Sequence, residues 1–165
     1  MPATSSTASE SVDFALAAYR EDGRWQVAEL TPDRATDVET LAAALRRFPG
    51  EGGTLGMVAV EEDFFVLVRV AGHQTRVMIS DITAATEWEI AADVVEHLGL
   101  GPVEDDDDAE PGGDLELLRD LGVGAVDIAE ILDDDELYPD EMLSEVARAL
   151  GFGEIFDDVV GLTSA

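Results

Sequence analysis

The sequence predicts an α+β protein in which a five-stranded antiparallel sheet with two helices is followed by a small acidic helical module. Three observations predict this fold. Short apolar segments joined by tight turns indicate antiparallel neighbouring strands. Two stretches with helical periodicity lie among and after those segments. A segment rich in Asp, Gly and Pro then separates them from a C-terminal end with repeated helix signals.

The first predicted elements are strands at 12–20 and 24–31. Asp22-Gly23 joins them, and this dipeptide supplies the positive φ angles of a two-residue hairpin. The run Thr36-Asp37-Val38-Glu39 is a capping box that opens a helix with an apolar stripe on one side. Pro49-Gly50 is expected to end that helix.

Three further strands are predicted at 54–61, 64–71 and 74–80, with tight connections. A second helix is expected to begin at Asp81 or Thr83 and to end at Gly99. The resulting order is β-β-α-β-β-β-α, which also occurs in profilin-like folds of the longin and roadblock type. Such folds often pair through sheet edges or helices. The analogy in element order therefore leaves a homodimer as an open alternative.

The remaining chain is predicted to hold a linker and a helical module. Residues 101–113 have the composition of an acidic linker, and residues 1–11 that of a disordered tail. The domains expected are therefore the sheet domain at 12–100 and the module at 114–162. Within the module, helices are predicted near 114–121 and 125–132, then from Pro139 to Gly151, with a short last helix after it. About 50 residues are marginal for independent stability, so docking on the sheet or on a partner is expected.

Charge is the strongest compositional signal. The formal net charge is −29, made up of −10 in residues 1–100 and −19 in residues 101–165. Direct nucleic-acid binding is therefore not expected, because phosphate contacts need clustered Lys and Arg. A basic partner would instead be attracted over long range. There is no cysteine, no apolar run of the roughly 18 residues that a membrane span needs, and no signal-peptide pattern, so a cytoplasmic protein is predicted.

No catalytic, cofactor or metal site is predicted. The Asp105–Asp108 run is interpreted as a solvated linker, and neither it nor Asp133–Glu136 has the glycine and glutamate positions of a calcium loop. His97 suits a helix C-terminus, and His73 a hairpin turn. The histidines lack a nucleophile to activate, and no glycine-rich phosphate loop is found.

Two C-terminal spans resemble the signature of the actinobacterial tRNA adenosine deaminase-associated protein family: Glu136-Leu-Tyr-Pro-Asp-Glu-Met-Leu143 and Leu150-Gly-Phe-Gly-Glu-Ile-Phe-Asp157. The similarity extends over about residues 12–162. It implies association with a deaminase and offers no catalytic residues to transfer. The deaminase itself needs an H-x-E and P-C-x-x-C zinc arrangement, which this cysteine-free chain lacks.

These features predict a non-catalytic accessory protein that meets a tRNA adenosine deaminase, or another basic protein, by charge-steered docking of the acidic module. Two alternatives stay open: a sheet-edge scaffold or dimerisation module, and a carboxylate-based metal-dependent hydrolase. Aromatic and acidic residues of the signature are the predicted partner interface, although the aromatic ones also suit a core. They are Tyr138, Pro139, Asp140, Glu141, Phe152 and Phe156.

Overall fold

The computed structural model describes residues 12–31, 35–48, 50, 53–60, 63–100, 110–134 and 136–161. Its elements, in chain order, are β1 (Val12–Glu21), β2 (Arg24–Leu30), α2 (Val38–Leu45), β3 (Thr54–Val60), β4 (Phe64–Ala71), β5 (Gln74–Ile79), the 3₁₀-helix η2 (Ile82–Thr86), α3 (Glu89–Leu98), β6 (Gly112–Gly113), the 3₁₀-helix η3 (Arg119–Leu121), α4 (Ala125–Leu132), α5 (Pro139–Leu150) and α6 (Gly153–Val160). The predicted tail and most of the predicted linker lie outside the described residues.

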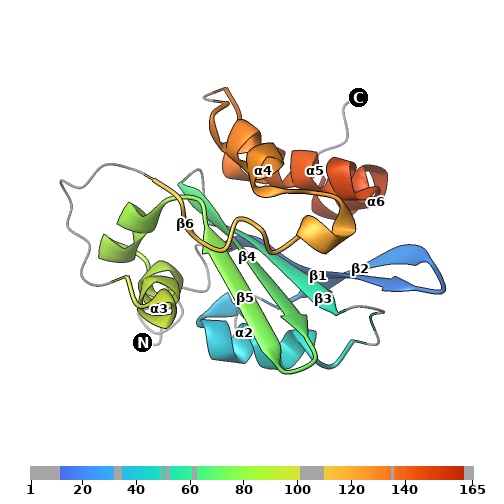
Figure 1. Ribbon diagram of the computed structural model, residues 1–165, viewed down its shortest axis with the longest axis horizontal. Helices are drawn as coiled ribbons and strands as arrows, with labels where there is room; N and C mark the ends of the chain where they lie inside the picture. The colour runs from blue at the N-terminus through green and yellow to red at the C-terminus, as the bar shows by residue number, and fades with distance from the viewer. Residues whose placement is uncertain are drawn as a thin grey trace, which may run out of the picture.

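The strands form one antiparallel sheet in the order β2-β1-β3-β4-β5-β6 (Figure 1). Both turn residues of the β1–β2 hairpin have positive φ, 54° at Asp22 and 77° at Gly23, as the dipeptide predicts. The tight β3–β4 and β4–β5 connections keep sequential strands adjacent. The sheet is therefore built mainly from local pairings.

The sheet has six strands among the described residues, so the prediction of five was wrong. The additional strand, β6, consists of the last two residues of the predicted linker and pairs with Met78 and Ile79 of β5. The helix predicted near 114–121 is also wrong, because only the short η3 forms there. The second predicted helix is two elements: Asp81 caps η2, and α3 starts afresh after Trp88.

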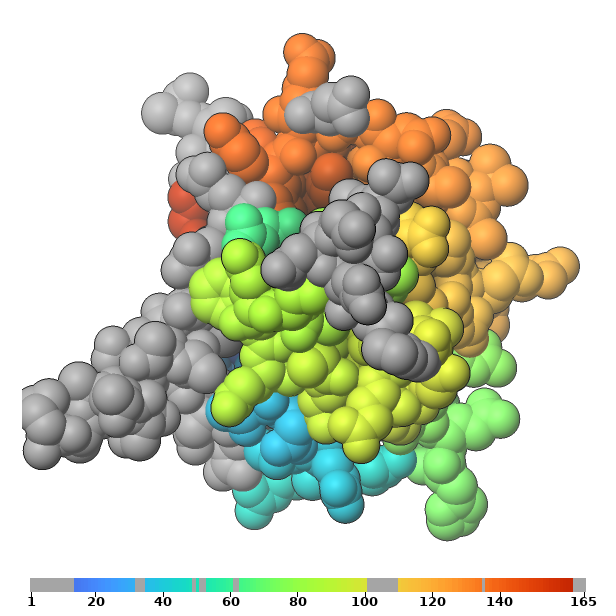
Figure 2. Space-filling view, turned by 90° about the vertical axis from the view of Figure 1, so that its left-hand side faces the viewer, coloured from blue at the N-terminus to red at the C-terminus, as the bar shows by residue number. Residues whose placement is uncertain are grey.

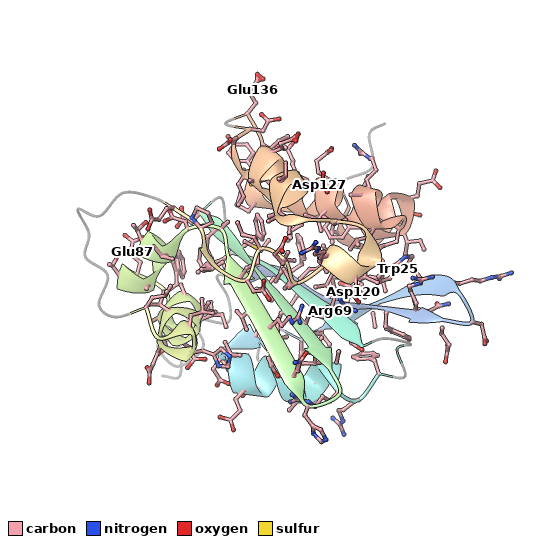
Figure 3. The ribbon with its side chains drawn as sticks, in the orientation of Figure 1. Trp25, Arg69, Glu87, Asp120, Asp127 and Glu136 are labelled. Atoms are coloured by element: carbon pink, nitrogen blue, oxygen red, sulfur yellow. The ribbon has the colours of Figure 1, made fainter. Side chains whose placement is uncertain are left out.

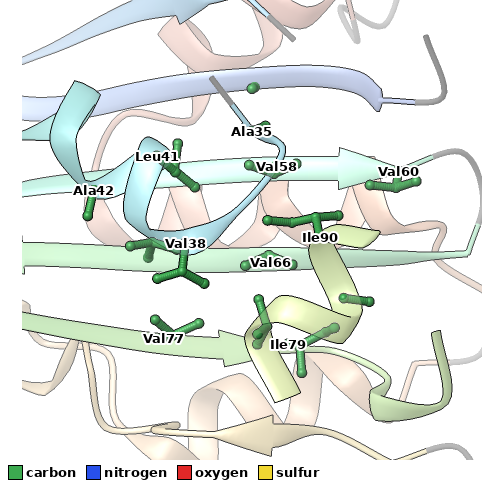
Figure 4. Close-up of a cluster of buried hydrophobic side chains, with 14 of the residues drawn as sticks. Ala35, Val38, Leu41, Ala42, Val58, Val60, Val66, Val77, Ile79 and Ile90 are labelled. Atoms are coloured by element: carbon green, nitrogen blue, oxygen red, sulfur yellow. The ribbon is translucent and has the colours of Figure 1, made fainter. Parts of the chain in front are cut away.

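Helices cover both faces of the sheet (Figure 1). On one face, α2 and α3 pack on alternate strand residues, and Figure 4 shows Val38, Leu41 and Ile90 over Val58 and Val66. The other strand residues face the module and share a second core with it. Burial on both faces explains why the central strands are almost continuously apolar, since alternation with polar residues needs one wet face.

Aromatic contacts fix the module to the far edge of the sheet. The Trp25 ring on β2 stacks against Phe152 with 4.6 Å between ring centroids, and its Nε1 donates to the Leu150 carbonyl oxygen at 3.2 Å. Phe14 on β1 meets Phe156 edge to face at 5.6 Å. The module is thus docked on the sheet through the end of α5, through Phe152 between the last two helices, and through Phe156 within α6.

Candidate protein-interaction surface

Helix α4 is attached to the protein along one narrow stripe. Ile128 is its one fully buried side chain, with Ile131 and Leu132 partly buried beside it. These positions share one helical face by their spacing of three and four residues. Val126, the second residue of α4, is apolar as well but is 71% exposed. Val126 and Ile128 lie about 200° apart around a helix, so both cannot face the same core.

The opposite face of α4 and the turn after it form a continuous exposed region, which we call the α4 surface. It is made of exposed residues that are either acidic or apolar. They are Val126, Asp127, Ala129, Glu130, Asp133, Asp134, Glu136 and Tyr138. Figure 3 labels Asp127 beside the first turn of α4 and shows Glu136 projecting from the turn above it.

No positive charge lies near this surface in the sequence. From Asp120 to Ala147 the chain holds ten acidic residues and no basic one. The side chains of Glu130 and Asp133 make neither a hydrogen bond nor an ion pair among the described residues. In the space-filling view, the orange residues of this region form the top of the molecule (Figure 2). The α4 surface therefore carries uncompensated negative charge at the periphery.

Several carboxylates of the region also hold local structure. Asp127 accepts from the Gly124 backbone N–H at 3.0 Å and so caps the start of α4. Glu141 accepts from the Tyr138 N–H at 2.9 Å, and Asp140 from the Glu141 N–H at the same distance. These bonds satisfy donors that a helix N-terminus leaves free.

The predicted interface residues separate into two groups. Phe152 is 1% exposed and Phe156 is completely buried, so the structure places both in the core beneath α5 and α6. Pro139 is buried at the first position of α5, with Asp140 and Glu141 half-buried. Tyr138 is the exposed member, at 54%.

Sequence reasoning did not select the other residues of the α4 surface. It placed Val126 among the apolar residues of the helix predicted near 125–132. The position of each residue around the helix axis distinguishes Val126 from the buried residues. Ile128, Ile131 and Leu132 share one face of α4 at 3.6 residues per turn, and Val126 lies outside that face.

A cleft lies elsewhere, between the ends of β4 and β5 and residues 114–120. Its volume is about 1070 Å³, and its charged lining residues are Arg69, Arg76, Asp114, Glu116, Arg119 and Asp120. Each of these arginines faces a carboxylate: Arg69 with Asp120, Arg76 with Asp114 at 3.7 Å, and Arg119 with Glu116 at 3.0 Å. The cleft is therefore an internally neutralised ion-pair cluster.

Within that cleft, Arg69 is the buried centre. The residue is 6% exposed, and its guanidinium donates to the Leu117 carbonyl oxygen at 3.0 Å and to both oxygens of Asp120, one of them at 2.9 Å. Figure 3 shows the two side chains meeting between the sheet and the segment above it. The hydrogen bond from Arg69 lowers the pKa of Asp120 below its ordinary value. This pair connects β4 with the module.

A second groove runs between α2 and α3. Asp93 of α3 accepts from the Val38 N–H at 2.8 Å and so caps α2 from a neighbouring helix. His97 lines the same groove and is exposed in the last turn of α3, while His73 is exposed in the β4–β5 turn. Among the described residues, no three acidic or histidine side chains are grouped to hold a metal ion.

Comparison with known proteins gives one family. Residues 13–153 match the family described as Rv3753c-like tRNA adenosine deaminase-associated protein. Protein Rv3753c of Mycobacterium tuberculosis is 38% identical over 151 residues, which cover 89% of this chain and 87% of that protein. No solved structure matches the chain. In the part of the chain that the structure describes, none of the helices has the length and apolarity of a membrane span.

Proposed function

Because the chain belongs to the Rv3753c-like tRNA adenosine deaminase-associated protein family, we propose that it is a non-catalytic accessory protein that binds a tRNA adenosine deaminase. The observation that carries this proposal is the α4 surface, an exposed and uncompensated acidic region on a docked helical module. An enzyme that acts on tRNA needs Lys and Arg clusters for the phosphates. The two proteins therefore have complementary charge, which accelerates encounter.

The proposal assigns the apolar and acidic residues different tasks. Carboxylates steer the approach through long-range attraction, and this effect weakens as salt increases. Exposed apolar side chains such as Tyr138 bury area on contact and slow dissociation. The cytoplasm is the compartment in which such a partner of a tRNA-modifying enzyme acts.

The test is size-exclusion chromatography with light scattering on the full chain mixed with the tRNA adenosine deaminase of the same genome. We expect a complex whose mass is the sum of both partners and whose population falls between about 50 and 300 mM salt. Absence of a complex at low salt would refute the proposal.

One observation favours a second candidate function, the sheet-edge scaffold. Among the described strands, β2 is paired on one side only, and its seven residues contain neither proline nor glycine. Such an edge is a template for another strand. Pairing of two copies would, however, bring together two chains of net charge −29, so it would need high salt. A dimer of the isolated chain that grows with salt would support the scaffold instead.

A further inference from the structure

We infer that the α4 surface docks on the face of the deaminase that binds the tRNA backbone, so that this protein and tRNA exclude one another. The inference rests on the proposed function and adds the surface, the chemistry of its counterpart and a form of regulation. Its basis is the combination of charge and exposed apolar anchors at α4.

The outer face of α4 presents carboxylates in a regular row. Asp127, Glu130 and the C-cap residue Asp133 follow one another at spacings of three residues, which places neighbouring carboxylates about 5–6 Å apart along the helix. A basic groove that tracks successive phosphates also meets negative charges in a regular row. The same arginines and lysines can therefore pair with either ligand, but not with both at once.

Apolar side chains flank this row. Val126 lies at the start of α4 and Tyr138 directly before α5, and both are mostly exposed. Neither is used by the second core, which α4 enters through Ile128. Aromatic side chains are typical anchors of protein interfaces, whereas a purely electrostatic surface gives little specificity. Val126 and Tyr138 therefore offer the deaminase apolar contacts that the tRNA backbone does not offer it.

The occupant is identified by charge. The nearest arginines in the sequence are Arg119 and Arg148, and each forms an ion pair with a glutamate one helical turn away. A second copy of this chain would bring like charges together, and an RNA would be repelled by every exposed carboxylate of the region. A basic protein face is the complement that remains.

Binding kinetics of the full-length chain on the immobilised deaminase test the inference. The variant E130Q/D133N removes two carboxylates that form neither a hydrogen bond nor an ion pair among the described residues. Its control, E87Q/E96Q, removes two exposed charges on the opposite side of the sheet. We expect E130Q/D133N to lower the association rate about tenfold at low salt, with E87Q/E96Q within about twofold of the parent.

The apolar anchors are tested separately. Y138S keeps a residue favoured at a helix N-cap, and I155A changes an exposed apolar residue of α6 as its control. Y138S should raise the dissociation rate about tenfold, and I155A should leave it unchanged. Added tRNA, at constant ionic strength, should reduce complex formation in proportion to its occupancy of the enzyme.

The outcomes separate the two proposals. A complex that forms equally with E130Q/D133N, or that persists on a tRNA-saturated deaminase, would overturn the inference and leave the accessory function standing. Failure of the parent chain to bind would overturn the accessory function itself, and the inference with it.

Discussion

Replacing Asp120 with asparagine should destabilise the protein measurably, because it removes the charge opposite a buried guanidinium. The guanidinium of Arg69 donates to the Leu117 carbonyl oxygen and to both oxygens of this carboxylate. The asparagine side chain keeps one oxygen that can accept a hydrogen bond from Arg69. Its NH2 group replaces the second oxygen and would place a donor against a guanidinium nitrogen, which is itself a donor. A charge-assisted hydrogen bond contributes about 1.5–3 kcal/mol, and water screens a side chain that is 62% exposed, so we expect a loss of about 1.5 kcal/mol.

Thermal or denaturant unfolding measures this loss. For a chain of this length, about 1.5 kcal/mol corresponds to a decrease of about 3–6 °C in Tm. Glu116→Gln is the matched control, since it removes the carboxylate of an exposed pair with Arg119 in the same cleft and should cost less than about 0.5 kcal/mol. Equal effects of the two substitutions would refute the assignment of Arg69–Asp120 as the stabilising pair.

The same pair has a defined pH dependence. The pKa of Asp120 in the folded protein is lowered from its ordinary value of 3.8, so the folded state binds this proton more weakly than the unfolded state does. The stabilisation is fully present above pH 3.8 and is lost as pH falls through the lower folded pKa. The stability difference between the parent and D120N should thus stay constant from pH 7 to 5 and shrink below about pH 4.

Three further substitutions test other parts of the fold. Phe156→Ala removes a completely buried ring from the second core and should cost about 3–5 kcal/mol in chemical denaturation. Gly113→Ala should destabilise β6 by about 1–3 kcal/mol, because φ is +97° there and a Cβ would lie 2.3 Å from a carbonyl oxygen of β5. Asp93→Ala removes the carboxylate that caps α2 at Val38 and should cost about 1 kcal/mol in the same assay.

Each substitution has a neighbour that isolates its cause. Ile155→Ala changes an exposed residue of the same helix as Phe156 and should be near neutral. Gly23 also has a positive φ, but no atom lies within 4 Å of a Cβ added there. If Gly23→Ala lowers the free energy of unfolding as much as Gly113→Ala does, the clash of the added Cβ with β5 is not the cause. Glu96→Gln removes an exposed acid from α3; a loss equal to that of Asp93→Ala would contradict the capping role.

The sequence was sufficient to predict those turns and helix ends that depend on residues close to one another in the chain. Asp22-Gly23 specifies its hairpin through two positive φ angles, and Pro139 with Gly151 marks the bounds of α5 from its first residue to its C-cap. The predicted stripe of α2 is buried in full, although Asp37 caps the helix where the capping box pointed to Thr36. In these places the relevant partners lie within a few residues.

Elements that depend on distant partners were missed. The two glycines of β6 have no strand propensity, and they pair because β5 presents Met78 and Ile79 at the sheet edge. Leu115, Leu118 and Leu121 recur every third residue, a spacing that fits a 3₁₀ turn as well as an α-helix, and η3 occupies the end of that stretch. The candidate interface shows the same limit, because only the packing against Trp25 and Phe14 places Phe152 and Phe156 inside.

Apolar burial and charge repulsion have opposite effects on the stability of the module. Residues 101–165 carry a net charge of −19, and mutual repulsion favours their separation. Apolar burial against the sheet offsets this repulsion and fixes α4 with its carboxylates outward. A basic partner that covers the α4 surface would relieve the repulsion and bind only the folded state. Such a partner should therefore raise the Tm of this protein, and more strongly at low salt than at high salt.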